Sequence, residues 1–268
     1  MKIVFFGATD LGHQCLELII ESRLAEVAGI FTIPQEFSIS YSPVPIKNMQ
    51  YADFRKIANA HNIPLIEVQG KMRDYKKQLM DLEPDFLLVI GWYYMIPKSL
   101  RELAAKGCAG IHASLLPKYR GGAPLVWAMI NGEKETGVSL FYFEDGVDNG
   151  NIIAQKKFPI TGDDTIREVL AKAADASLSI LEEFIPQIAK NVAPSIPQNH
   201  AEATHVPQRK PADGCIDWAW DTQRIKNFIR AQTRPYPGAF TIIGGKKITI
   251  WDADIIDITQ ESLNDNNC

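Results

Sequence analysis

The chain has 268 residues, of which 46% are hydrophobic and 22% charged, and its formal net charge is −4. That length is sufficient for an α/β core with a smaller second unit, and the composition is typical of a globular protein. No apolar run approaches the roughly 20 residues that cross a bilayer, and the negative charge argues against nucleic acid as the main partner. We therefore expect neither a membrane nor a nucleic acid among its partners.

The cysteines and the N-terminus indicate where the protein works. Cys15, Cys108, Cys215 and Cys268 are widely spaced, so we expect no zinc site, no other metal and no disulfide framework. Residues 1–10 contain no cleavage-site pattern and predict a first strand rather than a signal peptide. Both observations favour a cytoplasmic location. Cys108 could act as a nucleophile, but a small buried core residue is the commoner role of such a cysteine.

The first two-thirds of the chain alternate apolar runs with amphipathic segments. We predict strands at 2–6, 27–31, 64–68, 86–90, 107–112, 137–143 and 152–158, with helices to about 22, over 53–61 and 74–81, and from about 123. A long helix is expected to start at Asp164 or Thr165 and to end or kink near Pro186. Strands that alternate with helices predict an α/β fold with a doubly wound, Rossmann-like parallel sheet.

The composition changes after the long helix. Residues 193–213 contain four prolines and little periodicity, which predicts a linker on the surface. A helix over about 221–231 follows, and then two alternating runs around Gly244-Gly245 that predict a hairpin. We therefore divide the chain into a catalytic unit (1–192), a linker (193–213) and a small, mainly β C-terminal subdomain (214–268).

Two segments carry the chemistry, GIHASLLPKYRGGAP (110–124) and GVSLFYFEDGVDNG (137–150). His112 ends an apolar run and Asp148 lies in a glycine-rich loop, so the two can form an acid–base pair where their strands end. Other roles are a solvated or structurally paired histidine and a turn aspartate. Asp145 is the competing carboxylate.

These segments resemble the signature of the formyltransferases that use 10-formyltetrahydrofolate, which include methionyl-tRNA formyltransferase, glycinamide ribonucleotide transformylase and the sugar-nucleotide N-formyltransferases. The resemblance lies in Ser114-Leu115-Leu116-Pro117 after His112, in Arg120-Gly121-Gly122, and in the Gly-Val-Asp-x-Gly frame around Asp148. It extends over about residues 1–190 and, more loosely, 205–253. The resemblance implies formyl transfer to an amine, with His112 near the oxyanion and Asp148 binding the histidine and relaying protons.

One position departs from the pattern. The family has an asparagine two residues before the histidine, where it holds the carbonyl oxygen of the formyl group, and this chain has Gly110. Loss of one oxyanion donor typically costs about 10²–10³ in rate. A water or a substrate group could replace the amide, the substitution could be introduced, or the chain could have changed or lost its chemistry. If the family mechanism operates, Gly110→Asn should preserve or increase transfer.

The resemblance also implies 10-formyltetrahydrofolate as the donor and assigns its binding residues. These are Tyr93, Tyr94, Met95 and Ile96 after the apolar strand, Ser114, Leu115 and Leu116 in the turn, and Glu144 and Asp145 on the opposite loop. An aromatic run of this kind is otherwise core, but ligands of open α/β sheets bind at the carboxyl ends of strands.

Acceptor-binding residues are assigned to two turns. Gly7 and Thr9 lie in GATDLG, which is not a dinucleotide fingerprint and, as a tight packing turn, needs no ligand. Lys118, Arg120 and Gly121 follow the proline of the second turn, where a guanidinium suits a phosphate or carboxylate, although a solvated loop pair is an equal alternative.

Three features argue against methionyl-tRNA as acceptor: the acidic chain, a single lysine in residues 32–50, and a C-terminal unit too short for a complete barrel. The segments RPYPGAFTIIGGKKITIW and WAMINGEKETGVSL resemble sugar-nucleotide N-formyltransferases instead. We therefore expect a nucleotide-linked amino sugar as acceptor, on a route to a surface polysaccharide such as lipopolysaccharide. Another small amine, methionyl-tRNA, or binding without turnover remain alternatives. The apolar hairpin at 239–251 predicts a homodimer.

Overall fold

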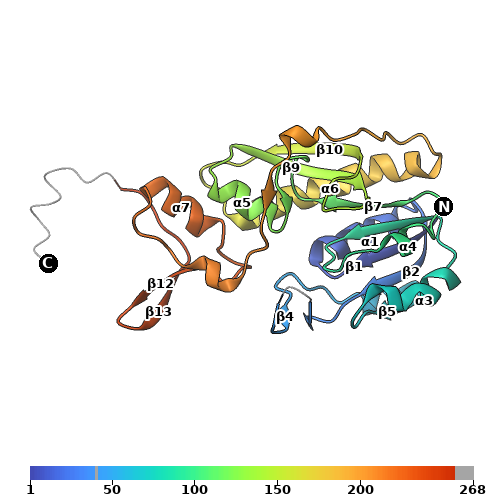
Figure 1. The fold of residues 1–268 in the computed structure, drawn as a ribbon, viewed down its shortest axis with the longest axis horizontal. Coiled ribbons are helices and arrows are strands. Elements are labelled where there is room, and N and C mark those ends of the chain that lie inside the picture. Colours follow the sequence, from blue (N-terminus) through green and yellow to red (C-terminus); the bar gives the residue numbers. More distant parts are fainter. Residues whose placement is uncertain (40–41, 257–268) are drawn as a thin grey trace, which may run out of the picture.

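The structure, a computed structural model, describes residues 1–39 and 42–256 (Figure 1). Its centre is a seven-stranded sheet in the order β10-β9-β7-β6-β1-β2-β5. The strands are β1 (Lys2–Gly7), β2 (Glu26–Thr32), β5 (Leu65–Glu67), β6 (Phe86–Ile90), β7 (Cys108–His112), β9 (Glu135–Tyr142) and β10 (Ile152–Pro159). Each of these seven overlaps a predicted strand.

The sheet is parallel from β5 to β7 and antiparallel at one edge. β9 runs antiparallel to both β7 and β10. A loop of residues 143–151 joins β9 to β10, and the amide of Tyr142 donates to the carbonyl of Asn151 (2.8 Å) at its base. The predicted α/β Rossmann-like fold is therefore confirmed as a mostly parallel sheet, with a hairpin edge of the kind that open α/β sheets often carry.

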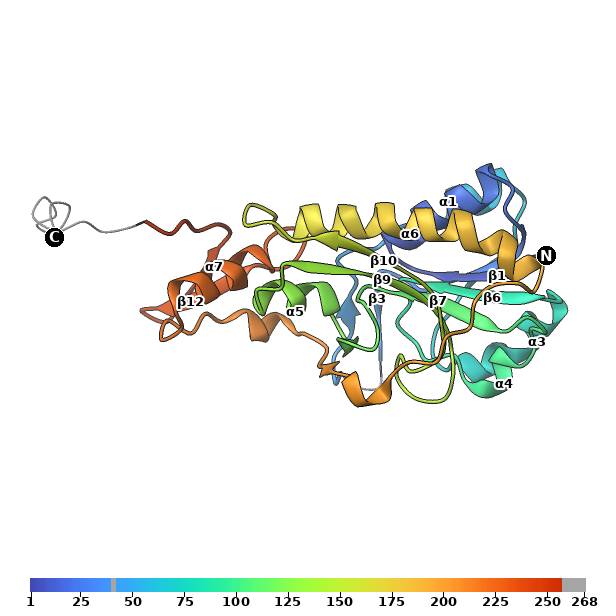
Figure 2. The same ribbon diagram turned by 90° about the horizontal axis from the view of Figure 1, so that it is seen from above.

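Helices cover both faces of the sheet. They are α1 (Asp10–Glu21), α2 (Arg55–Ala60), α3 (Lys76–Asp81), α4 (Lys98–Arg101), α5 (Pro124–Ile130), α6 (Ile166–Ala189) and α7 (Thr222–Arg230). Figure 2 shows α1 and α6 on one side and α3 and α4 on the other. Strand β1 contributes side chains to the buried clusters on both faces of the sheet, because successive side chains of a strand point to opposite faces. Ile3 and Phe5 belong to one cluster, and Val4 and Phe6 belong to the other.

Short elements complete the chain. They are β3 (Glu36–Phe37), β4 (Ile46–Lys47), β8 (Arg120–Gly121), β11 (His205–Val206), β12 (Ala239–Ile243), β13 (Lys246–Ile250) and 3₁₀ turns at Met72–Tyr75, His200–Glu202 and Pro211–Gly214. The predicted C-terminal hairpin is present as β12 and β13, which lie with α7 at one end of the molecule (Figure 1). None of the helices in the described ranges has both the length and the apolarity to cross a membrane.

The long helix α6 follows its predicted start and ends close to its predicted end near Pro186. The Thr165 hydroxyl accepts from the Arg167 amide and Glu168 reaches back to the Thr165 amide, so Thr165 is the cap. The helix continues through Pro186 to Ala189. Asp164 has a different role, since it binds Lys172 (2.6 Å) within the helix.

Residues 193–213 cross the surface and pair with the core. Ile196 forms a bridge with Ile152, and β11 pairs in parallel with β8. Further along, Arg230 of α7 donates to the carbonyls of Thr161 and Asp164 (both 2.7 Å). These bonds fix the C-terminal residues to the sheet unit, while the three-part division of the chain stays a prediction.

Candidate functional site

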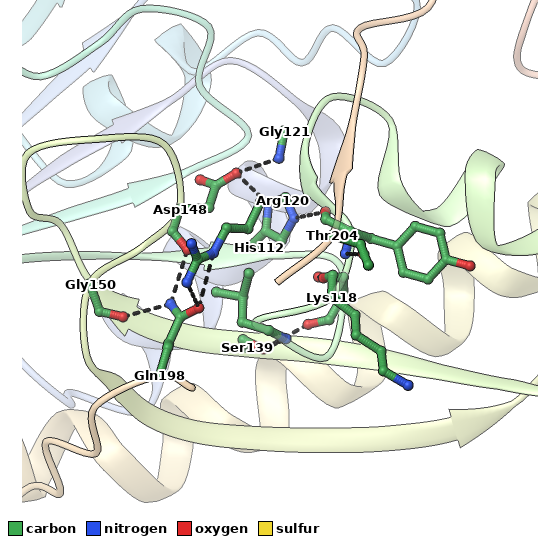
Figure 3. A network of polar contacts seen from close by, with 12 residues as sticks. His112, Lys118, Arg120, Gly121, Ser139, Asp148, Gly150, Gln198 and Thr204 are labelled. Carbon is green, nitrogen blue, oxygen red and sulfur yellow. Dashed lines mark hydrogen bonds and ion pairs between the residues drawn. The ribbon is translucent and has the colours of Figure 1, made fainter. Parts of the chain in front are cut away.

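His112 and Asp148 meet where β7 and the 143–151 loop come together (Figure 3). The Nδ1 atom of His112 lies 3.5 Å from Oδ2 of Asp148, and the two side chains are 10% and 22% exposed. The two residues proposed from sequence are thus neighbours in a largely buried position, although 36 residues separate them.

The backbone of Tyr119 orients the His112 ring. Nε2 of His112 lies 2.7 Å from the carbonyl oxygen of Tyr119. Because a carbonyl can only accept, Nε2 carries a hydrogen, and the other ring nitrogen, Nδ1, faces the Asp148 carboxylate. Tyr119 has a left-handed backbone (φ +58°) and its amide donates to Oγ1 of Thr204 (2.8 Å).

Asp148 is held from two sides. Its Oδ2 accepts from the Gly121 amide (2.8 Å), and its backbone is left-handed (φ +50°). The side-chain amide of Gln198 donates to the carbonyls of Asp148 (2.9 Å) and Gly150 (2.7 Å). The competing carboxylate, Asp145, is 76% exposed and pairs with Arg101 instead. The geometry therefore favours Asp148 over Asp145 as the partner of His112.

The side chain of Arg120 is committed within the protein. It is 4% exposed, and its Nε and Nη2 donate to Oε1 of Gln198 (3.1 and 2.6 Å). Nη2 also contacts Nδ1 of His200 (3.1 Å). These contacts account for the guanidinium without a bound anion. Lys118, the other basic residue of the turn, is exposed.

Gly110 has no room for a side chain. It lies in β7 between β6 and β9, and a Cβ there would fall well inside 3.0 Å of the Val89 carbonyl oxygen and 2.8 Å from two ring carbons of Phe143. An asparagine here would therefore require the neighbouring strand and Phe143 to move. That Gly110→Asn preserves or increases transfer stays a prediction.

A cavity lies beside Asp148 between the β6 loop and the 143–151 loop. It is lined by Tyr94, Met95, Ile96, Arg101, Phe141, Phe143, Glu144, Gly146, Val147, Asp148 and Asn149. Four of the nine residues predicted to bind folate are in this wall. Tyr93 lies behind it and donates to Oδ1 of Asn48 (2.9 Å).

The other predicted folate residues build the Ser-Leu-Leu-Pro turn. The Ser114 hydroxyl donates to the Lys118 carbonyl (2.6 Å), and the Leu116 amide donates to Oγ of Ser139 (3.0 Å). Leu115 packs so closely against Gly137 of β9 that a Cβ added at Gly137 would clash with the Leu115 side chain. These contacts shape the turn that leads to Tyr119, and the assignment of the three residues to folate binding stays a prediction.

Comparison of the sequence with known protein families identifies the family of the chain. Residues 1–185 match the sequence profile described as "Formyl transferase", and residues 209–264 match "Formyl transferase, C-terminal domain". The chain belongs to the formyltransferase family. It is an enzyme family of one-carbon transferases, in agreement with the predicted reaction class and the predicted folate formyl donor.

Individual relatives of this formyltransferase fall into two groups. A methionyl-tRNA formyltransferase of Alkaliphilus oremlandii is 36% identical over 259 residues, which cover 96% of this chain and 81% of the relative. Among solved structures, a 4-N formyltransferase from Francisella tularensis superposes with a TM-score of 0.73 at 20% identity, over 96% and 98% of the two chains. The sugar 3N-formyl transferase WlaRD, solved in the presence of dTDP and 5-N-formyl-THF, gives 0.68 at 22% identity, over 92% and 84%. Because the sequences of these two structures are only 20% and 22% identical to this chain, the likeness shows a shared fold and no more.

The formyltransferase site includes residues that the sequence did not single out. Arg101 and Asn149 line the cavity, and Nε of Arg101 and Oδ1 of Asn149 are buried without a hydrogen-bond partner. Buried polar atoms in proteins are nearly always paired, so a free donor and a free acceptor in the lining of one cavity suit a bound polar group. Gln198 and Thr204 are two further residues that the sequence did not single out. No sequence motif specifies these two residues, Arg101 or Asn149.

Other predicted positions have structural roles in this formyltransferase. The Thr9 hydroxyl caps α1 by accepting from the Gly12 amide (3.3 Å), and Gly7 packs against Phe54 and the Ile90 carbonyl. Burial raises the pKa of the Cys108 thiol to about 12, so the thiolate is scarce at neutral pH, as a core residue requires. Within the described part of the chain, no group of three His, Cys, Asp or Glu could hold a metal ion.

Proposed function

We propose that this formyltransferase moves a formyl group from 10-formyltetrahydrofolate to the amine of a nucleotide-linked amino sugar, with His112 and Asp148 as its catalytic residues. The observation that carries the proposal is the pairing of His112 with Asp148, whose Nδ1 and Oδ2 atoms lie 3.5 Å apart beside the cavity. In that role the protein would act in the cytoplasm, on a route to a surface polysaccharide such as lipopolysaccharide.

The cavity wall fits one end of a folate. The free Nε of Arg101 donates and the free Oδ1 of Asn149 accepts, which suits the alternating donors and acceptors of a pterin edge. Tyr94, Met95 and Ile96 supply the apolar side. The cavity encloses about 70 Å³, below the roughly 300 Å³ of small-ligand pockets. The 143–151 loop must therefore shift outward when the ring enters.

Bound folate supplies the formyl group, and the residues of the chain handle the proton. The acceptor amine loses a proton as it becomes an amide, and the donor nitrogen gains one when its bond to the formyl carbon breaks. Nδ1 of His112 would take the first proton and return it to that donor nitrogen. The imidazolium that forms is then paired with the Asp148 carboxylate, which the Gly121 amide holds in place. Because Gly110 offers no side-chain amide, we assign to protonated His112 the positive charge that offsets negative charge developing on the formyl oxygen.

A second hollow supports a nucleotide-bearing acceptor. It encloses about 590 Å³ between α5, α7 and the segment that precedes α7, and its walls include Trp127, Trp220, Arg209, Lys210 and Arg224. The Arg224 guanidinium lies 4.5 Å from the centre of the Trp220 ring, and that of Arg209 lies 4.9 Å from the Trp127 ring. Indole faces and cations together suit a nucleobase with phosphates.

The charge of the chain also supports the sugar acceptor. The formal net charge is −4, whereas neutralisation of phosphates by basic residues dominates tRNA affinity. Methionyl-tRNA is the second candidate, which the 36% identity to enzymes of that name favours.

The test measures tetrahydrofolate release from 10-formyltetrahydrofolate with a panel of nucleotide-linked 3- and 4-amino sugars, beside methionyl-tRNA. We expect turnover with an amino sugar, and a loss of about 10²–10⁴ in rate for His112→Gln and Asp148→Asn. Turnover with methionyl-tRNA alone would show that the acceptor is methionyl-tRNA, while the proposed formyl transfer from folate would stand. Full activity of both variants would overturn the assignment of the catalytic pair.

We also propose that the enzyme is a homodimer joined through its C-terminal hairpin. Ile242 and Ile243 of β12 are 62% and 63% exposed, and Ile248 of β13 is 44% exposed. An apolar two-stranded edge of this kind is prone to pair with another chain. Light scattering at micromolar concentration should give twice the chain mass, and a monomer there would remove the proposal.

A further inference from the structure

Residues 195–206, which we call the strap, lie between the two sequence profiles that define the family and connect the two catalytic loops. At its start, Asn151 donates to Oγ of Ser195 (3.0 Å). At its end, the Thr204 carbonyl accepts from the Arg120 amide (2.9 Å), and its hydroxyl accepts from Tyr119. The strap therefore touches both the loop that orients His112 and the loop that carries Asp148 (Figure 3).

Gln198 is the strap residue that enters the site. It is 5% exposed, and all four hydrogen-bonding positions of its amide are used. Oε1 accepts twice from Arg120, and Nε2 donates to the carbonyls of Asp148 and Gly150. A guanidinium can only donate and a carbonyl can only accept, so the amide cannot turn over without breaking every bond. Its orientation is fixed.

The two carbonyls that Gln198 binds lie at and just after the left-handed turn of the loop. Asp148 has a positive φ, a conformation that aspartate tolerates in a turn and that further contacts can hold in place. Gln198 supplies such contacts by binding the carbonyls of Asp148 and Gly150 with one amide group. That backbone in turn directs the Asp148 carboxylate to the Gly121 amide and to His112.

We propose that Gln198 is a positioning residue for formyl transfer, which acts by holding Asp148 in the conformation that faces His112. This inference rests on the proposed role of Asp148. Arg120 contributes to this positioning. It donates to the Gln198 oxygen and so orients the amide nitrogen toward the 143–151 loop. Arg120 and Gln198 are far apart in the sequence, but together they hold the loop that carries the Asp148 carboxylate.

Three variants separate this role from general stability. Gln198→Glu keeps an acceptor for Arg120 but removes both donors, so it acts on the Asp148 loop alone. Gln198→Leu also leaves Arg120 unpaired and is the harsher change. Asn151→Ala is the matched control, because it removes a side-chain bond between the strap and the same loop without touching Asp148.

For Gln198→Glu we expect kcat to fall roughly 10²-fold, the scale of a small misplacement at a reacting centre, with little change in KM for 10-formyltetrahydrofolate. Asn151→Ala should keep kcat within a few fold of wild type. In an Asp148→Asn background Gln198→Glu should cost nothing further, because the residue it positions is gone. An equal loss in both backgrounds, an equal loss in Asn151→Ala, or wild-type kcat in Gln198→Glu would overturn the inference.

A structural measurement needs no acceptor. In a crystal structure of Gln198→Glu we expect the Asp148 carboxylate to leave the Gly121 amide, which it now contacts at 2.8 Å. A carboxylate that stays within hydrogen-bond distance there, with φ still positive, would overturn the role of Gln198. A wild-type rate for Asp148→Asn alone would instead overturn the proposed function, so the two failures are distinguishable.

Discussion

Gly110 offers the sharpest test of how β7 is packed. An asparagine at this position needs a Cβ that would lie far too close to the Val89 carbonyl and 2.8 Å from the Phe143 ring. Phe143 is a side chain that can turn aside, whereas the Val89 carbonyl belongs to the neighbouring strand of the sheet. We therefore expect Gly110→Asn to destabilise the protein, not to restore a missing catalytic group.

The magnitude follows from overpacking. Forcing extra atoms into a filled core typically costs about 1–3 kcal/mol, and each kcal/mol lowers the midpoint of thermal unfolding by about 2–4 °C in chains near this size. The midpoint should thus fall by roughly 2–12 °C. Adding Phe143→Leu should recover part of the loss only, because the contact with the Val89 carbonyl remains.

The assay is thermal unfolding together with formyl transfer, with Gly162→Asn as control. Gly162 has no atom within 4 Å of its would-be Cβ and no positive φ, so its variant should unfold within about 2 °C of wild type. A Gly110→Asn protein that unfolds at the wild-type midpoint and transfers formyl faster would refute the reasoning, and would place the asparagine of the family pattern back in the mechanism.

Three further predictions concern the surroundings of the site. Thr204→Val removes the acceptor of the Tyr119 amide at constant shape, so kcat should fall while stability drops by about 0.5–1.5 kcal/mol; an unchanged kcat would show that Tyr119 needs no such support. Arg101→Leu should weaken binding of 5-formyltetrahydrofolate about tenfold or more, measured by fluorescence titration; an unchanged Kd would mean that folate does not use that wall. Burial acts to raise the pKa of Asp164, but hydrogen bonds from Lys172 and Thr161 outweigh it and lower that pKa. The stability that this pair contributes is therefore present above the ordinary aspartate pKa and lost as pH falls through the lowered one, so the midpoint of Asp164→Asn should approach that of wild type in acid. A gap that stays constant down to acid pH would contradict this.

Local patterns made the fold and the proximity of His112 to Asp148 predictable. The apolar run at 86–90 became β6 in the middle of the sheet, and the spacing of His112 and Asp148 placed them on adjoining strand ends. The antiparallel edge was harder to foresee, because strands β9 and β10 have the same alternation whether they run parallel or antiparallel.

Contacts between distant segments could not be read from the sequence. Gln198 reaches Asp148 across 50 residues from a segment without periodicity, so nothing local marks its side chain as buried. Arg120 shows the converse case. Its motif suggested an anion-binding guanidinium, but the partners that occupy that group, Gln198 and His200, lie about 80 residues away. Residue type gave the chemistry of these groups, and only the tertiary structure gave their partners.

The two supports of the 143–151 loop differ in strength, and this decides how the loop can open for folate. At one end, Arg101 donates to the Phe143 carbonyl (2.7 Å) and pairs with Asp145, and since the Asp145 side chain is 76% exposed, the ion pair is the weaker of these two contacts. At the other end, Gln198 is 5% exposed, and breaking its bonds would leave buried carbonyls and Arg120 unpaired. The loop should therefore swing at its Asp145 end while Asp148 stays beside His112, so folate can enter without dismantling the catalytic pair.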